Sequence, residues 1–480
     1  MFIYRHRRIG TTCFFIAATT FFYSCAVTAQ LQNQSDSAGV ISTQHIIPQQ
    51  ELPSLSGPTP DNMPDRAPDV LDIKNAVQRA VQWHPDISEA IGVLFSQSEK
   101  VDVARAKYYP QISGGFNNGI TNTYRDNGYS PSLVLSLSQM LYDFGKVDNA
   151  VREANAAVAQ QQANVLVSID TIAHDAAAAL VQVQGYQQLV SIAQDQLQAL
   201  NSIGDLARQR NDEGASSLSD VVQTRTRIEG ARATLTQYQA SLDRWRATLA
   251  TYMGWKMINR VNNDFPGELA NACQTTQVDD RLVPSVLAAW ARANQAQAQV
   301  ASADAQMLPT ISLEPEVTHY LNDRYANSAA LDRTQYSAWV RVQMPLYQGG
   351  ALSASRNAAQ HSLEAANAAV RTAQLDARQQ LSEAQNESGS LQQTLQIQAR
   401  QQALGEKTRS LYQDQYLQLG TRPLLDVLNA EQEIYQSRFT EQQTQSQLRS
   451  LQLDCLYSTG RIRSVFTLDS QAIQGVEIRP

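Results

Sequence analysis

The sequence predicts a mainly α-helical protein with a membrane β-barrel portion, built from two copies of one helix–β-hairpin–helix unit. Three observations point to this class: landmark residues that recur about two hundred positions later, alternating apolar and polar residues after two prolines, and very long proline-free stretches. The recurring landmarks are Pro85 with Pro284, Pro110 with Pro309, Gly214 with Gly420, and Asp220 with Asp426. Such regular recurrence over half the chain indicates a duplicated structural unit.

Residues 1–29 have the features of a secretory signal peptide. They comprise a basic start at Arg5, Arg7 and Arg8, an apolar segment over residues 9–26 and the small-residue sequence Val27-Thr28-Ala29. An alternative is a lipoprotein signal with Cys25 as the acylated residue. The preceding Phe22-Tyr23-Ser24 lacks the small aliphatic pattern usual before such a cysteine, so cleavage after residue 29 is the better interpretation.

Residues 30–69 are polar and include six prolines from Pro48 to Pro68, a composition that cannot bury an apolar core. We expect this segment to be a flexible leader. A short amphipathic helix from Val70 to about Trp83 should follow and should end before His84-Pro85, because a residue before proline is disfavoured in the helical conformation.

The first structural repeat is expected over residues 70–265, with a β-hairpin at about 110–142. Along its first strand Ile112, Gly114 and Phe116 alternate with Ser113, Gly115 and Asn117. This period of two is typical of a strand with two different faces. The proline-free residues 146–212 then predict a helix of about 100 Å, since an α-helix rises 1.5 Å per residue, and residues 216–252 predict a shorter one.

The second structural repeat is expected over residues 266–465, with a hairpin at about 309–347 and helices at 351–419 and 423–457. Its strands alternate more clearly. In the first strand Ile311, Leu313 and Val317 fall on one face, and Ser312, Glu314 and Glu316 fall on the other. These strands approach the length of nine to eleven residues that crosses a bilayer when tilted. Residues 466–480 form a C-terminal tail for which no element is predicted.

The helix lengths predict how the helices stack. Each hairpin is preceded by a helix of about 25 residues, at 85–109 and 284–308. Placed end to end with the shorter helix of its repeat, each matches the long helix, so we expect two antiparallel columns per repeat. The many Ala and Gln residues suit close packing in a curved wall. The alternative is an alanine-rich coiled coil without a channel, which leaves the two hairpins without a role.

Four strands per chain cannot close a membrane barrel, and an open sheet edge in lipid leaves backbone groups unpaired. The chain must therefore assemble. Three copies would share twelve strands and leave an aqueous interior, which suits the charged residues Glu314, Glu316 and Arg341 on one strand face. Beyond the signal, the sequence has no uninterrupted apolar stretch of about eighteen residues, so we expect strands to cross the membrane.

Charge and cysteine content narrow the possible partners and the compartment. The net charge of −7 includes no basic cluster in the mature chain that would favour nucleic acid. Removal of the signal leaves Cys273 and Cys455 as the only cysteines, in a compartment that permits disulfides. These two residues either pair in a disulfide or stay as buried thiols.

Sequence motifs for catalysis or metal binding are absent. The six histidines are dispersed, without a His-x-x-x-His pair or a neighbouring cysteine, so we expect no metal and no cofactor. The sequence has neither a phosphate-binding Gly-x-x-x-x-Gly-Lys loop nor a Gly-x-Ser-x-Gly nucleophile elbow. We therefore expect a protein that is not an enzyme.

Over about residues 70–465 the chain resembles the TolC family of outer-membrane efflux and secretion proteins. The motifs that carry the resemblance are Pro110-Gln111-Ile112, Leu141-Tyr142-Asp143-Phe144-Gly145, Pro345-Leu346-Tyr347-Gln348-Gly349-Gly350 and Gly420-Thr421-Arg422-Pro423-Leu424-Leu425-Asp426-Val427-Leu428-Asn429-Ala430. The resemblance implies a homotrimer with a twelve-stranded barrel in the outer membrane and a twelve-helix periplasmic tunnel. It also implies a passive exit duct that works with a periplasmic adaptor and an inner-membrane pump, either ABC-type or proton-driven.

The resemblance further implies a gate at the periplasmic mouth of the tunnel. In the family a tyrosine and an arginine of the second repeat contact a hydroxyl residue and an aspartate of the first; the matching residues are Tyr416, Arg422, Ser219 and Asp220. The family's pair of constriction aspartates corresponds here to Asp426 and Asn429, so the second acid is missing.

The residues around the proposed gate also have a simpler interpretation. Arg422 and Asp426 are four positions apart at a helix start, where a local ion pair contributes about 0.3 to 0.5 kcal/mol. Gly214 and Gly420 are typical of helix ends, and the hydroxyl and polar residues after them can cap the next helix. The sequence leaves gating and capping open.

Overall fold

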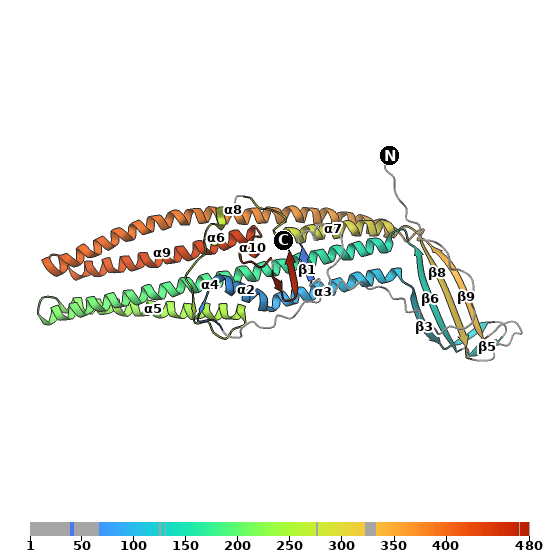
Figure 1. Ribbon diagram of the computed structural model, residues 1–480, viewed down its shortest axis with the longest axis horizontal. Coiled ribbons are helices and arrows are strands. Elements are labelled where there is room, and N and C mark those ends of the chain that lie inside the picture. Colours follow the sequence, from blue (N-terminus) through green and yellow to red (C-terminus); the bar gives the residue numbers. More distant parts are fainter. Residues whose placement is uncertain are drawn as a thin grey trace.

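The structure is a computed structural model that describes residues 39–42, 67–123, 126–129, 131–274, 277–321, 333–469 and 471–479. The expected signal peptide with Cys25, and most of the leader, lie outside these residues. The described chain is elongated, with a β-sheet at one end and two helical hairpins reaching the other (Figure 1). A group of short elements lies beside the helices between these ends.

One four-stranded antiparallel sheet contains both predicted hairpins. Its order is β3 (Gln111–Asn117), β6 (Ser132–Tyr142), β8 (Thr310–Tyr320) and β9 (Thr334–Gln343). The tip of the first hairpin continues as a ribbon of β4 (Ile120–Thr123) and β5 (Asp126–Tyr129). Because β6 pairs with β8, the two repeats meet within the sheet, and β3 and β9 form its edges.

The two faces of the sheet differ as the alternating sequence predicts. In the paired register Ile112 lies opposite Leu137, Phe116 opposite Leu133, and Ile311 opposite Val342. These apolar side chains share one face, and several are exposed in the single chain, with Ile112 at 69%, Phe116 at 57% and Val342 at 65%. On the other face Arg341 Nε pairs with Glu314 Oε2 at 2.7 Å.

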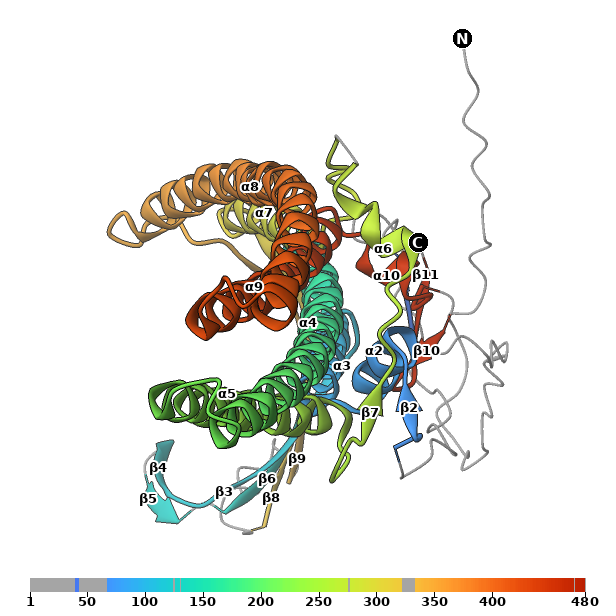
Figure 2. The ribbon, with the colours of Figure 1, turned by 90° about the vertical axis from the view of Figure 1, so that its left-hand side faces the viewer.

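Six long helices make four columns that lie side by side, with neighbouring columns antiparallel as expected. Column one stacks α3 (Pro85–Arg105) and α5 (Leu218–Met253), and column two is α4 (Lys146–Asp212). Column three stacks α7 (Pro284–Ala305) and α9 (Leu424–Ser458), and column four is α8 (Ala351–Asp414). Helix α4 packs against α3, α5, α7 and α9, whereas α8 packs against α7 and α9, so the columns follow one another in a curved wall (Figure 2).

The sequence explains where the long helices begin. Gly145 and Gly350 stand directly before α4 and α8 with φ of 90° and 85°, a conformation that costs little only for glycine. Asp143 strengthens the first of these starts, because its carboxylate accepts hydrogen bonds from the backbone N–H groups of Gly145 at 3.0 Å and Val147 at 2.6 Å. The motif Leu141-Tyr142-Asp143-Phe144-Gly145 is thus a strand-to-helix junction.

The short elements between sheet and helix ends form a region we call the waist. It contains the following elements: α2 (Ile73–Trp83), α6 (Gly267–Ala270), α10 (Ile462–Val465), the 3-10 turn η2 (Ala272–Gln274), β2 (Val70–Leu71) with β7 (Arg260–Val261), and β1 (Gly39–Ser42), β10 (Ala472–Ile473) and β11 (Val476–Arg479). A second 3-10 turn, η1 (Ala106–Tyr108), links α3 to the sheet. The waist shares one apolar core with the middle of α4.

Two expectations about the chain ends need correction. Part of the segment expected as a flexible leader, Gly39–Ser42, is a strand that pairs in parallel with β11. The C-terminal tail, for which no element was predicted, supplies β10 and β11, whose Ile473, Val476 and Ile478 are at most 1% exposed. Strands this short escape detection from sequence because their stability comes from the neighbouring strand and the core rather than from local preference.

Helix α4 bears on the expectation that strands, rather than helices, cross the membrane. Among the described residues it is the single helix long and apolar enough to cross a membrane, although polar residues interrupt its apolar stretch. In the folded chain 61% of that stretch is buried. Residues such as Leu166, Ile169, Ala173 and Leu180 are fully buried against the neighbouring columns, so α4 is the central helix of the wall.

Candidate functional site: the free ends of the helical hairpins

The candidate gate lies where α4 turns into α5 and where α8 turns into α9, at the end of the molecule remote from the sheet (Figure 1). Both turns contain a glycine with positive φ, Gly214 at 73° and Gly420 at 63°. The expected helix 351–419 ends differently from a regular α-helix, because its last turn, η3 (Gln415–Leu419), is a π-helix. A π turn changes which side chains face the neighbouring helix, and such turns are frequent at functional sites.

Ser219 and Asp220 lie in the cap of α5. Ser217 Oγ accepts a hydrogen bond from the backbone N–H of Asp220 at 3.2 Å, and Asp220 Oδ2 accepts one from the N–H of Ser217 at 3.3 Å. Ser219 Oγ is 2.7 Å from Ser217 Oγ. This reciprocal arrangement is a capping box, which is the simpler role that the sequence left open.

Arg422 contacts residues of its own hairpin. Its Nη1 pairs with Asp426 Oδ2 at 2.8 Å, and its Nε donates to Gln415 Oε1 at 2.9 Å. Its guanidinium carbon lies 4.4 Å from the centre of the Tyr412 ring. Within one protomer Arg422 therefore makes the local i, i+4 ion pair. This pair is partly exposed, so its contribution is small.

Tyr416 is the one proposed gate residue that is buried, at 6% exposure. It packs with Leu200, Ile203, Leu424, Val427 and Leu428, which joins η3 to both α4 and α9. Arg210 of α4 stacks on its ring, 4.7 Å from guanidinium carbon to ring centre. Burial raises the pKa of the Tyr416 hydroxyl; the charge of Arg210 lowers it and the charge of Asp220 raises it further.

Asp426 and Asn429, the residues expected at the constriction, have different partners. Asp426 is held by Arg422, as described above. Asn429 is exposed, and its Oδ1 accepts a hydrogen bond from Nη2 of Arg227 at 3.1 Å. Sequence reasoning missed both Arg210 and Arg227, because their contacts join residues about two hundred positions apart and no local pattern signals them.

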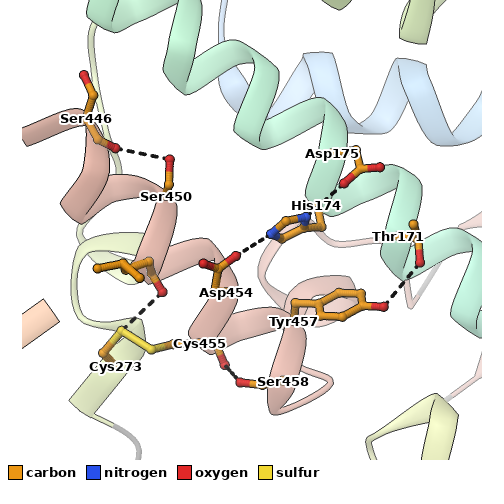
Figure 3. A network of polar contacts seen from close by, with 11 residues as sticks. Thr171, His174, Asp175, Cys273, Ser446, Ser450, Asp454, Cys455, Tyr457 and Ser458 are labelled. Atoms are coloured by element: carbon orange, nitrogen blue, oxygen red, sulfur yellow. Dashed lines mark hydrogen bonds and ion pairs between the residues drawn. A yellow bond between two sulfur atoms is a disulfide. The ribbon is translucent and has the colours of Figure 1, made fainter. Parts of the chain in front are cut away.

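A second polar cluster joins the two repeats at the waist (Figure 3). His174 of α4 lies between Asp454 of α9, with Nε2 2.7 Å from Oδ1, and Asp175, with Nδ1 3.1 Å from Oδ1. Burial opposes its charge, but the hydrogen bonds to Asp175 and Asp454 outweigh that effect and raise the pKa of His174 to about 9. The imidazolium therefore links α4 and α9 at neutral pH.

Cys273 of η2 and Cys455 of α9 are joined by a disulfide in the structure, with an S–S distance of 2.11 Å (Figure 3). The bridge lies one residue along α9 from Asp454, so it belongs to the same waist region. Among the described residues no group of three or more His, Cys, Asp or Glu side chains could hold a metal ion.

Comparison with known proteins gives consistent results. A model of the outer membrane efflux protein family matches residues 76–255 and 282–454. The outer membrane efflux protein BepC of Brucella suis is 26% identical over 80% of this chain and 83% of its own length. The outer membrane protein TolC of Salmonella enteritidis is 24% identical over 76% and 77%. The crystal structure of the outer membrane protein VceC from Vibrio cholerae superimposes with a TM-score of 0.71 at 19% identity, covering 81% of this chain and 96% of that one.

Proposed function

Since the chain belongs to the outer membrane efflux protein family, we propose that it works as a homotrimer with a periplasmic adaptor and an inner-membrane pump. As a family member it is an outer-membrane exit duct with a large periplasmic portion. The descriptions of the family and of BepC name efflux, so we favour efflux over type I secretion as the cargo route.

The observation that supports the trimer best is the shared order of strands and helical columns. Helix α3 leads into β3, β6 into α4, α7 into β8, and β9 into α8. The strand order β3-β6-β8-β9 therefore repeats the column order, and each strand continues one column. The open edges of the sheet and of the wall belong to the same two sides of the chain. A rotation that places one side of a protomer against the other side of the next protomer closes the sheet and the wall together.

The apolar residues left on these two sides support the same assembly. On α8, Ile397, Leu404 and Leu411 recur every seven residues and are 57%, 68% and 50% exposed. On the opposite side, Val103 of α3 and Leu218 of α5 are each 67% exposed. A heptad stripe needs a partner helix. We infer that α8 of one protomer packs on the α3 and α5 column of the next.

Three copies would bring the strand number to twelve, which leaves a water-filled interior. The apolar sheet face with Ile112 and Phe116 would then contact outer-membrane lipid. The face with Glu314 and Arg341 would line the interior. A non-conducting coiled coil would have no use for such a two-faced sheet, so we do not favour that alternative.

The adaptor and pump follow from what the chain itself lacks. Its sequence has no nucleotide-binding loop, and the described residues hold no candidate metal cluster. In this proposal a pump in the inner membrane, ABC-type or proton-driven, supplies the transport energy. The helical hairpins extend away from the sheet over several tens of ångströms, because α5 alone has 36 residues. This reach would bring the gate towards such partners in the periplasm.

The proposal is tested with the full-length protein purified in mild detergent. We expect a trimer in sedimentation, a trimer band on gels that disappears on heating, and ion conductance across a planar lipid bilayer. A stable monomer in the membrane would contradict the trimer. Trimers that insert but never conduct would favour the structural coiled coil instead.

A further inference from the structure

Arg227 joins the two helical hairpins through hydrogen bonds that are separate from the helix caps and from the proposed gate residues. It lies on α5, in the first repeat, and its Nη2 donates to Asn429 Oδ1 of α9 at 3.1 Å. Its Nη1 donates to Gln432 Oε1, one turn further along α9. One guanidinium thus bridges successive turns of a helix from the other repeat, beside the expected constriction.

The hydrogen-bond partners of Arg227 do not neutralise its positive charge. Both acceptors are neutral amides, and the structure gives Arg227 no ion pair among the described residues. Asp426, three residues before Asn429, is already held by Arg422 at 2.8 Å. Glu433 lines the same groove as Arg227 and Asn429. Each protomer therefore carries one unpaired base and one acid in this groove, next to an acid that has its own partner.

This geometry explains the effect of having Asn429 where the family has the second aspartate of the constriction. An aspartate at position 429 would lie within hydrogen-bonding distance of Arg227 and would form a charge-assisted pair with it. The asparagine found here keeps the hydrogen bond and leaves the positive charge available to the interior.

We propose that Arg227, positioned by Asn429 and Gln432, determines the charge selectivity of the tunnel mouth and makes it permissive for anionic cargo. The inference rests on the proposed function, because it requires the groove to face a conducting path. Rings of like charge near a constriction set which ions pass. Three copies of Arg227 would offset the three copies of Glu433, so the mouth would lack the strong cation preference of an acidic ring.

The test is the reversal potential of single channels in a potassium chloride gradient, using the full-length trimer in planar bilayers. Arg227→Gln removes the charge, and Asn429→Asp neutralises it in place. We expect both variants to raise the ratio of potassium to chloride permeability severalfold. Arg227→Lys keeps the charge and should restore a ratio close to that of the unchanged protein.

Arg225→Gln is the matched control, because Arg225 is exposed on the same helix and two residues away, on the opposite face. It should leave the permeability ratio nearly unchanged. An unchanged ratio in both Arg227→Gln and Asn429→Asp overturns the proposal, as does an equal shift in the control. If Arg227→Gln fails to assemble, Asn429→Asp decides alone. Absence of any conductance in the unchanged protein is a different result: it refutes the exit duct itself, and this inference with it.

Discussion

At the scale of single residues, the free ends of the hairpins combine two kinds of contact. Arg422, Ser219 and Asp220 make short-range contacts within their own hairpins, which stabilise helix ends. Tyr416, in contrast, is buried between α4 and α9 and receives Arg210 on its ring. We infer that Tyr416 holds the two hairpins of a protomer together. Arg422 could exchange Asp426 for a partner on a neighbouring hairpin at little cost, because exposed ion pairs contribute little.

The first prediction concerns this gate. The double variant Arg422→Ser with Tyr416→Phe should favour the open mouth and raise single-channel conductance severalfold, because it removes the guanidinium and the hydroxyl that we expect to contact a neighbouring protomer in the closed trimer. Tyr416→Phe alone should cost little stability, because the Tyr416 hydroxyl has no hydrogen-bond partner in the structure. Arg400→Ser on α8 is the control, since among the described residues Arg400 Nε donates to Gln396 O of its own helix, at 3.3 Å, and makes no contact with another hairpin. Equal conductance in the double variant and the control would assign Arg422 and Tyr416 to capping and packing alone.

The second prediction is a pH dependence set by His174. Its pKa is raised from 6.5 to about 9, so its stabilisation is complete below about pH 6.5 and is lost as the pH rises towards 9. The partners Asp175 and Asp454 are 40% and 46% exposed, so solvent screening limits the effect to roughly 1 to 3 kcal/mol. The melting temperature, measured by circular dichroism, should fall between pH 6.5 and 9.5. The variant His174→Gln should not show this fall. The same fall in both proteins would contradict the assignment.

At the scale of elements, a buried ion pair fastens the short helix α10 to the central helix α4. Arg463 Nη1 lies 2.5 Å from Asp170 Oδ2, with the two side chains 4% and 2% exposed. Arg463 also donates to Leu282 O at 3.0 Å and lies 3.4 Å from Asp469. Burial raises the pKa of Asp170, and the charge of Arg463 opposes that rise. The pair therefore connects the end of the second repeat to the middle of the first.

The third prediction follows from that burial. Arg463→Met should reduce the free energy of unfolding by about 3 to 5 kcal/mol, because it leaves the Asp170 carboxylate without its main partner. Adding Asp170→Asn should recover much of the loss. The matched control is Arg152→Met, whose partner Asp148 is 2.8 Å away but whose pair is 68% and 52% exposed, so the change should stay within about 1 kcal/mol. Denaturant unfolding of the solubilised proteins gives the free energy of unfolding of the unchanged protein and of the three variants. Similar losses for Arg463→Met and Arg152→Met would contradict the argument.

At the scale of the whole molecule, a buried ion pair and the His174 cluster join the two repeats at the waist, and packing contacts join them towards the hairpin ends. The disulfide between Cys273 and Cys455, the His174 cluster and the Asp170–Arg463 pair all lie in or beside the waist. Towards the proposed gate the repeats are joined by Tyr416, by Arg227, and by Tyr435 and Phe439, which pack on Leu189 of α4. This distribution suits a duct whose mouth opens by relative motion of the hairpins around a fixed waist. We offer it as a hypothesis.

The fourth prediction concerns assembly along the α8 stripe. Leu404→Gln with Leu411→Gln should lower the temperature at which the trimer dissociates on gels, because both leucines would otherwise be covered by a neighbouring protomer. The secondary structure of the separated chain should stay unchanged, since neither side chain is buried within it. Met257→Gln is the control: Met257 is also 68% exposed but lies in the loop after α5. A trimer as heat-stable as the control would contradict the proposed interface.

The sequence alone determined the features that arise from neighbours along the chain. The range 146–212 expected for a long helix is the range of α4, and the expected face of Ile311 and Leu313 is one face of β8. Helix and strand periods, positive-φ glycines and capping residues act over a few positions, so a linear pattern records them. The repeat itself is visible because it copies such patterns at a fixed offset.

The tertiary structure decided which distant residues meet. The stacking of Arg210 on Tyr416, the bonds from Arg227 to Asn429 and the link between His174 and Asp454 each join residues more than two hundred positions apart. The pairing of β1 with β11 joins the two ends of the chain. Each contact depends on how whole columns pack and on which turn of a helix faces its neighbour. Local preference carries no record of that choice, because the free energy that fixes it comes from burial of complete helix faces.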